Sequence, residues 1–193
     1  MAQDSKQIKV AANGGLYLAR FDDSPALPEN IDDPLDTLLN EIGYASDDGV
    51  TFNKSEEVED INVWQSQNAV RRIVTSRDFS AATVLAQWNR ETVELAFGGG
   101  SWTEPESGVY RFDPPADYDA LTEWVAVIET IDGERVDRWV IERCNVTGDI
   151  ETQAVRNAGM MLSVNLSALT PDGKDRPWYY LSNDEAAFAA AGS

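Results

Sequence analysis

The sequence predicts a mainly β fold, either a β-sandwich or a partly closed barrel, with one short flanking α-helix. Two runs rich in β-branched residues, 70–76 and 79–87, are typical of strands. Apolar residues alternate with period two after Met161, as expected for a strand with one buried face. The segments 124–130 and 135–141 flank Asp132-Gly133, which is the strongest hairpin signal in the chain. These observations together predict seven or eight strands.

Shorter signals complete this outline. Residues 15–20 and 178–181 are expected to form the first and last strands, and Ser76 to Asp78 to link two separate strands. Asn89 is a suitable N-cap for a helix of about two turns that ends at Gly98-Gly99-Gly100. Asp47-Asp48-Gly49 indicates a turn between two further short strands.

One long segment lacks the residues that build a core. Between Tyr44 and Trp64 the chain is acidic and poor in large apolar side chains, so we expect a long exposed hairpin or loop. A loop of this length with little core of its own is usually functional or bound to a partner. We therefore expect a single domain, 1–193, with an N-terminal arm (1–14), an extended contact loop (44–64) and a C-terminal tail (183–193).

The charge of the chain limits its partners. Its 193 residues include 34 Asp and Glu against 15 Lys and Arg, a formal net charge of −19. Such a surface repels phosphates and anionic membranes, which argues against ordinary nucleic-acid binding. Two interpretations stay open: a solvated acidic surface, or a surface that must meet DNA without holding it. No apolar run approaches a membrane span, and residues 1–10 lack a secretory signal, so we expect synthesis in a cytoplasm and no membrane partner.

Histidine is absent and cysteine occurs once. Catalytic triads, histidine bases and His-ligated metals are thereby excluded, and we predict no catalytic residues and no enzymatic activity. Cys144 follows a strand-like run and is expected to be a small buried apolar residue rather than a nucleophile. Adjacent acids such as Asp22-Asp23 and Asp32-Asp33 fit no calcium-loop spacing, so we predict solvated turns, no metal and no cofactor.

Tryptophan and arginine each allow two interpretations. Six tryptophans keep a carbohydrate-binding sandwich, or less readily a glycosidase, as an alternative of a different class. Trp64, Trp88, Trp124 and Trp139 are more simply core or interface anchors. The arginines form two clusters, at Arg71, Arg72 and Arg77 and at Arg135, Arg138 and Arg143. These arginines either balance local charge or meet acidic segments of a neighbouring copy, as a heterologous contact requires.

The order of these segments is similar to that of a known family. The matching pieces are NGGLYLA at 13–19, GYASDDGVTF at 43–52, VWQ at 63–65, VRRIVTS at 70–76, Phe79, Leu85, WNRETVELAFG at 88–98 and, more loosely, residues 160–180. Together they resemble the major tail tube proteins of long-tailed (siphovirus-type) bacteriophages, most closely those of actinobacteriophages. The resemblance implies the phage tail tube fold, a β-sandwich or barrel flanked by a helix with a long inter-subunit loop.

The resemblance also implies a structural function in the virion. Tail tube subunits form hexameric rings that stack into a tube, and an acidic channel lets DNA pass without sticking. The implied partners are further copies of the chain, a tape measure protein in the lumen, tail terminator and distal tail proteins at the ends, and genomic DNA in transit. The residues expected at contacts between subunits or rings are Asp47, Asp48, Glu56, Glu57, Glu59, Asp60, Arg71 and Arg72. A tail terminator or a capsid decoration protein is the alternative within the same class.

Overall fold

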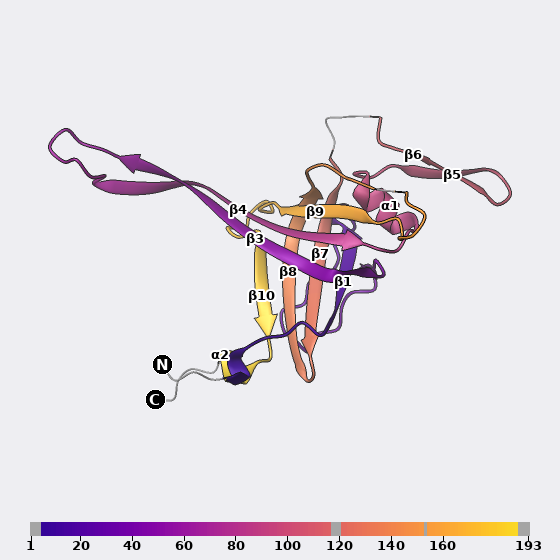
Figure 1. Cartoon of the computed structure of the whole chain (residues 1–193), viewed down its shortest axis with the longest axis horizontal. Coiled ribbons are helices and arrows are strands. Elements are labelled where there is room, and N and C mark those ends of the chain that lie inside the picture. Colours follow the sequence, from indigo (N-terminus) through magenta and orange to yellow (C-terminus); the bar gives the residue numbers. More distant parts are fainter. Residues whose placement is uncertain (1–4, 117–120, 153, 189–193) are drawn as a thin grey trace.

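The computed structural model describes residues 5–116, 121–152 and 154–188 (Figure 1). The strands are β1 (Asn13–Arg20), β2 (Asn40–Glu41), β3 (Ala45–Ile61), β4 (Arg71–Leu85), β5 (Ser101–Glu106), β6 (Val109–Asp113), β7 (Glu123–Asp132), β8 (Arg135–Val146), β9 (Leu162–Ala168) and β10 (Trp178–Ser182). The helices are α1 (Arg90–Ala96) and α2 (Glu185–Phe188), with 3-10 turns η1 (Ser5–Gln7) and η2 (Phe21–Asp23). The predicted mainly β architecture with a short helix is therefore confirmed.

Eight strands form one antiparallel sheet in the order β2-β1-β7-β8-β9-β4-β3, with β10 paired to β8. Strand β8 changes partner along its length, because residues 137–141 pair with β10 and residues 144–146 pair with β9. Beyond this change the β9-β4-β3 layer crosses the β1-β7-β8 layer (Figure 1). The sheet folds over itself as a sandwich and does not close into a barrel.

The main core fills the space between the two layers. Leu16 and Leu18 of β1, Leu85 of β4 and Leu162 of β9 meet there with almost no exposed surface. The core residues of β9 confirm the predicted alternation, since residues 162, 164 and 166 are buried and the residues between them are half-buried. Cys144 also lies in this core, where burial raises the pKa of its thiol to about 12, so it is the buried apolar residue that was predicted.

A second, smaller core lies on the outer face of the β1-β7-β8 layer. Val125 and Val127 of β7 and Val140 of β8 pack there against Leu39. Phe21, Leu27 and Leu35 complete the cover, all from the connection between β1 and β2. Residues 124–128 of β7 are thus buried on both faces, which explains their nearly continuous apolar sequence.

Buried charge fixes this covering segment, residues 21–39. Arg138 pairs with Glu129 at 2.6 Å, and both side chains are largely buried. The same guanidinium donates to the carbonyl oxygens of Asn30, at 3.2 Å, and Asp33, at 3.0 Å. Nε, Nη1 and Nη2 of this buried charge thus all have acceptors, which offsets the cost of removing it from water. Arg138 therefore balances charge within its own chain and is not left for a neighbouring copy.

An aromatic stack joins the two layers where the β3–β4 hairpin leaves the body. Phe52 of β3 and Trp139 of β8 lie with ring centroids 4.4 Å apart, and Phe79 of β4 and Trp178 of β10 lie 4.3 Å apart. Phe79 and Trp139 connect the two pairs at 6.0 Å. Four strands are thus tied at one point by large apolar side chains.

Local signals for the helix and the main hairpin are confirmed. The side chain of Asn89 accepts from the backbone N–H of Thr92, and Thr92 Oγ1 accepts in return from the N–H of Asn89. This reciprocal cap starts α1, and the three glycines at 98–100, all with positive φ, follow its end. Strands β7 and β8 form the predicted hairpin, with Gly133-Glu134 as the two connecting residues between the paired Asp132 and Arg135.

Three features differ from the sequence prediction. Residues 76–78 do not link two strands, because β4 runs unbroken from Arg71 to Leu85. Asp47-Asp48-Gly49 is not a hairpin turn but part of an irregularity within β3, where the register shifts between Ala45 and Val50. Such a bulge uses the same turn-forming residues without reversing the chain. The two-stranded β5–β6 hairpin is not among the strands that the sequence predicted.

The aromatic stack predicts a large difference between two aromatic substitutions. Phe79→Ala should lower the free energy of unfolding by about 3–5 kcal/mol, because it removes a buried ring from the stack. Trp64→Ala, which removes a fully exposed ring, should change it by no more than about 0.5 kcal/mol. Urea unfolding of the unassembled protein measures both values. Equal effects would show that the stack does not anchor the hairpin.

The covering segment predicts a dependence of stability on pH. Backbone N–H groups of Asn30 and Glu29 donate to Asp33, and those of Leu38 and Ala26 to Asp36, which lowers both carboxyl pKa values below the ordinary 3.8. A carboxyl group whose pKa is lower in the folded than in the unfolded state stabilises the fold at pH values above its unfolded-state pKa. This stabilisation is lost as the pH falls through the folded-state pKa.

The substitutions Asp33→Asn and Asp36→Asn should therefore lower Tm at pH 7, and this difference should shrink as the pH falls below the ordinary carboxyl pKa. Calorimetric scans across pH 2–7 measure it. Asp32→Asn is the matched control, because Asp32 has no recorded backbone bond of this kind in the described part. A Tm difference that is the same at every pH would contradict this explanation.

Candidate functional site

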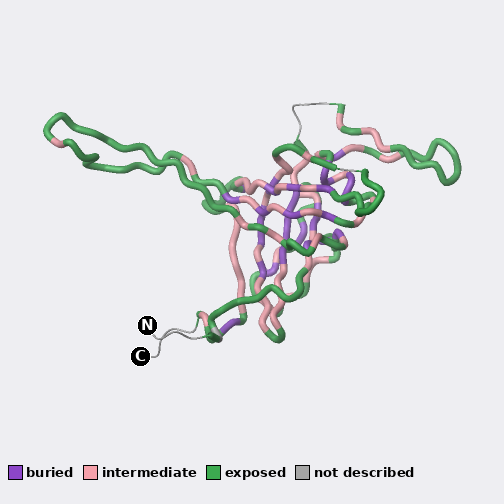
Figure 2. Tube along the Cα trace, in the orientation of Figure 1, coloured by how far each residue is buried: buried purple, intermediate pink, exposed green. Residues whose placement is uncertain are grey.

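The distal half of the β3–β4 hairpin stands away from the body. Pairing between β4 and β9 ends at Ser80, so residues 54–78 form a two-stranded extension with its turn at 62–70. Figures 1 and 2 show this projecting hairpin reaching out from the sandwich, with almost every residue exposed. The expected contact loop, 44–64, is therefore the outgoing strand and tip of a hairpin whose return strand is β4.

The projecting hairpin exposes apolar surface that none of the described residues covers. A two-stranded hairpin without a third strand is only marginally stable in water. Its large exposed apolar residues are Val58, Ile61, Val63, Trp64, Val70, Ile73 and Val74. Exposed apolar residues gathered on one element of a soluble protein are consistent with an interaction surface.

Its charges are largely paired within the hairpin. Arg72 and Asp60 form a two-pronged pair at 2.7 and 3.2 Å, which lowers the carboxyl pKa of Asp60 and raises the pKa of Arg72. Glu56 receives Lys54 at 2.9 Å and Arg77 at 3.2 Å. The hydrogen bond from Lys54 is the main reason that the pKa of Glu56 lies below its ordinary value.

Three of the predicted contact residues in the projecting hairpin are not in ion pairs. Within the described part, Glu57, Glu59 and Arg71 have no recorded ion pair, although all three are exposed. The structure thus brings together Asp60 with Arg72, and it leaves these three available to a partner. Asp47 and Asp48 are separate from the projecting hairpin, since they lie in the irregularity near the start of β3.

A second surface adjoins the hairpin. One face of the β3-β4-β9 layer packs on the core, and side chains between the buried ones point the other way. We call this the free sheet face, which comprises Thr51 and Asn53 of β3, Ser80, Ala82 and Val84 of β4, and Ser163, Asn165 and Ser167 of β9. All eight remain partly or fully exposed.

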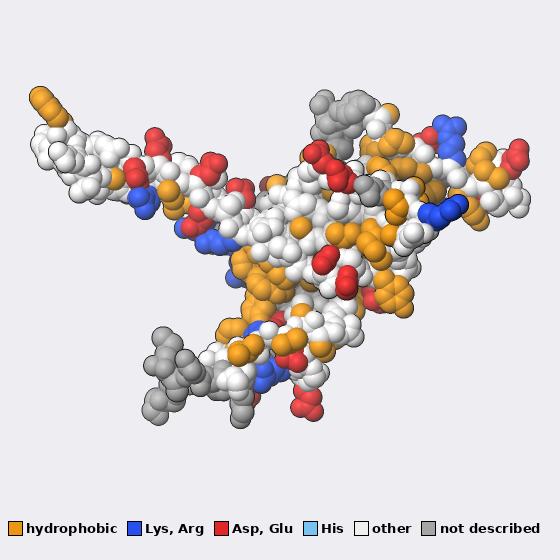
Figure 3. All heavy atoms as spheres, in the orientation of Figure 1, with side chains coloured by type: hydrophobic (Ala, Val, Ile, Leu, Met, Phe, Trp, Pro, Cys, Tyr) orange, Lys and Arg blue, Asp and Glu red, His pale blue; other side chains and the backbone are white. Residues whose placement is uncertain are grey.

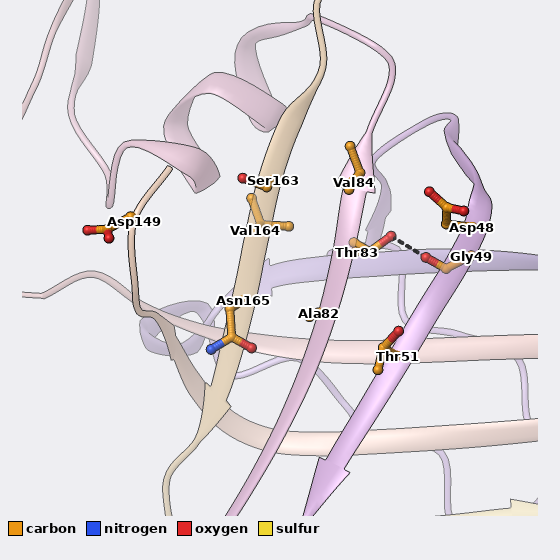
Figure 4. A pocket seen from close by; sticks show the side chains of 10 residues that line it. All are labelled: Asp48, Gly49, Thr51, Ala82, Thr83, Val84, Asp149, Ser163, Val164 and Asn165. Carbon is orange, nitrogen blue, oxygen red and sulfur yellow. Dashed lines mark hydrogen bonds between the residues drawn. The ribbon is translucent and has the colours of Figure 1, made fainter. Parts of the chain in front are cut away.

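The charged residues at the border of the free sheet face are acidic. Figure 4 shows a shallow groove on it, bordered by Asp48 and Asp149, and no Lys or Arg lines that groove. The register continues this face onto the projecting hairpin as the pairs Ser55–Asp78 and Glu57–Ser76. Lys54 and Arg77 belong to the alternate positions and lie on the opposite face. As far as the register shift after Glu57, the side chains of this surface are therefore small and neutral or acidic, and none of them is basic.

Sequence reasoning did not single out the free sheet face. Its residues are short hydroxyl, amide and methyl side chains, which carry no chemical signature. The alternation in β9 could have separated its two faces. It could not show which face the rest of the chain would leave uncovered.

The described residues offer little support for other kinds of site. No group of three or more His, Cys, Asp or Glu side chains among them is placed to hold a metal ion. No described helix is long and apolar enough to cross a membrane. Trp124 and Trp139 belong to the core, as the simpler interpretation of the tryptophans predicted, whereas Trp64 and Trp88 are exposed.

Comparison with known protein families agrees with the resemblance in the sequence. A family model described as "Phage tail tube protein" matches residues 1–192. Among solved structures, the chain is similar to a chain from the "virion of native gene transfer agent (GTA) particle". That pair shares 13% sequence identity with a TM-score of 0.37, over 88% of this chain and 96% of the other. No curated protein matches the chain.

Proposed function

Because this chain belongs to the phage tail tube protein family, we propose that it assembles as hexameric rings that stack into a tail tube, with the free sheet face lining a channel for DNA. Family membership makes it a structural protein of the virion tail. The observation that carries the finer proposal is a sheet face of eight small residues with acids at its border and no base.

The chemistry of this face suits passage rather than binding. Lys and Arg on the wall would neutralise phosphates and release counterions, so DNA would be held. Short neutral side chains give no such attraction, and carboxylates at Asp48, Asp149, Glu57 and Asp78 repel the backbone. The other layer is a poorer candidate for the wall, because residues 21–39 cover its outer face.

Exposed strand edges support assembly into rings. Strand β3 is the last strand of the sheet, so one side of its backbone pairs with no other described strand. A long uncovered edge invites pairing with another chain. Pairing of β3 with an edge of the next subunit would continue the free sheet face around a ring. The closed ring would then leave no free edge in that direction.

The projecting hairpin is proposed to bridge subunits or rings. Glu57, Glu59 and Arg71 would exchange ion pairs with a neighbouring copy, while Asp60 and Arg72 hold the hairpin straight. Asp47 and Asp48 lie at the other end of β3, and Asp48 borders the groove of the free sheet face. Further proposed partners are a tape measure protein in the channel, and tail terminator and distal tail proteins at the tube ends. No catalytic role is proposed.

Electron microscopy of the purified protein tests assembly. The wild-type chain should form rings or tubes on concentration or when tail initiator components are added. Glu57→Lys with Glu59→Lys should reduce tube yield strongly without changing Tm, because neither carboxylate has an ion-pair partner among the residues that the structure describes. Glu134→Lys with Glu185→Lys adds the same charge elsewhere on the surface and should assemble normally. A chain that stays monomeric under all these conditions is not a tube subunit.

The assignment of the channel wall is tested by introducing basic side chains on the free sheet face. Ala82 and Asn165 lie directly opposite each other on the free sheet face, so Ala82→Lys with Asn165→Lys should place two cations per subunit in the channel. Tubes of this variant should protect short duplex DNA from nuclease, and the protected fraction should fall steeply with salt. The control, Leu38→Lys with Asn40→Lys, carries the same charge outside the wall and should protect none. Equal protection by both variants would contradict the assignment of the wall.

A further inference from the structure

The tip of the projecting hairpin is uncharged. Residues 61–70 include no Lys, Arg, Asp or Glu, although a quarter of the chain is charged. Trp64 stands at this tip with its side chain fully exposed, at 100%, beside the exposed Val63 and Val70. A bare indole held in water at the end of a long hairpin has no stabilising role within the monomer. Its large apolar surface is suited to burial against a partner.

An aromatic groove lies in another part of the molecule. It has a volume of about 390 Å³ and is lined by Trp88, Asn89, Arg90 and Val93 around the start of α1, with Trp102 of β5 and Tyr110 of β6. The Trp88 indole N–H is fixed to the carbonyl oxygen of Met160 at 2.8 Å. The Arg90 guanidinium lies 5.7 Å from the Trp102 ring centroid. Tyr110 is 63% exposed.

Tip and groove lie at opposite ends of the molecule. In Figure 1 the projecting hairpin extends to one side of the body, and α1 with the β5–β6 hairpin lies on the other. Figure 3 shows hydrophobic side chains gathered over α1 and β5–β6. A chain therefore cannot fill its own groove, and any contact between the two is a head-to-tail contact between copies.

We propose that Trp64 of one copy seats in the Trp88–Trp102–Tyr110 groove of a second copy. This inference rests on the proposed function, which supplies a high local concentration of identical chains. The indole of Trp64 would stack on Tyr110 and Trp102, and the guanidinium of Arg90 would lie against the indole face. Among aromatic rings, indole is the most favourable partner for a cation. Because the tip is uncharged, the contact adds no repulsion between subunits that each carry −19.

The hairpin carries its tip well clear of the body. Its outgoing strand continues for eight residues, 54–61, beyond the three-stranded part, which corresponds to roughly 25 Å at the rise of a β-strand. Trp, Tyr and Arg are the residues that most often dominate binding energy at protein interfaces. All three types meet in this one contact.

Cross-linking tests the proximity. Gln65→Cys places a thiol beside Trp64, and Glu91→Cys places one next to the groove without changing a residue that lines it. The native Cys144 is fully buried and does not interfere. The two variants, each with one added cysteine and co-assembled in equal amounts, should be joined by a short thiol-reactive cross-linker in tubes and not before assembly. Gln65→Cys with Glu185→Cys is the control pair and should give no product.

The outcomes separate this inference from the proposed function. Tubes that form without the specific cross-link overturn the contact and leave the tube function intact; capture of the tip by a different tail protein would belong to this result. Failure of wild-type protein to assemble at all overturns both. Cross-linking of both pairs alike would also reject the contact, because it would show no specificity.

A double-mutant cycle supplies a second measurement. Trp64→Ala and Tyr110→Ala should each raise the critical concentration for tube growth about tenfold or more. The critical concentration of the double variant should be no higher than that of the more impaired single variant, because both substitutions remove the same contact. Tyr44→Ala removes an exposed aromatic residue outside both surfaces and should have little effect. Multiplying effects in the double variant would show that Trp64 and Tyr110 do not touch.

Discussion

The aromatic stack at the root of the β3–β4 hairpin is the interaction on which the remaining structure depends. Phe52, Phe79, Trp139 and Trp178 tie four strands together where the two layers cross. Beyond that point the hairpin has backbone pairing but no core, so its direction is set at its root. The free sheet face and the projecting hairpin belong to the same two strands. Their relative orientation is therefore fixed by one cluster of rings, which suits a subunit that must form a wall and a bridge together.

Charge is sorted by position rather than spread evenly. The projecting hairpin, 54–78, holds four basic and five acidic residues and is close to neutral. Seven acids and no base occur in residues 21–41, most of which cover the outer face of the other layer. The large net charge is therefore not concentrated in the contact hairpin, as the acidity of 44–64 had suggested. What distinguishes the proposed wall is the exclusion of Lys and Arg more than an excess of acid.

Local signals predicted the local structure well. The cap at Asn89, the glycines after α1 and the alternation in β9 each depend on near neighbours. Features that depend on distant partners were missed or misplaced. The bulge at Asp47 to Gly49 was taken for a turn, because the same residues serve both and only the register with β4 distinguishes them. The pairing of Asp60 with Arg72 also requires that register. The free sheet face could not be predicted, since its exposure depends on which segments pack elsewhere.

The most direct measurement is a reconstruction of the assembled tube by cryo-electron microscopy at a resolution that shows side chains. The account predicts that Ala82 and Asn165 point toward the tube axis, with β3 paired to the neighbouring subunit in the ring. It would be contradicted by a tube in which residues 21–39 face the axis and the β3-β4-β9 layer lies on the outer surface.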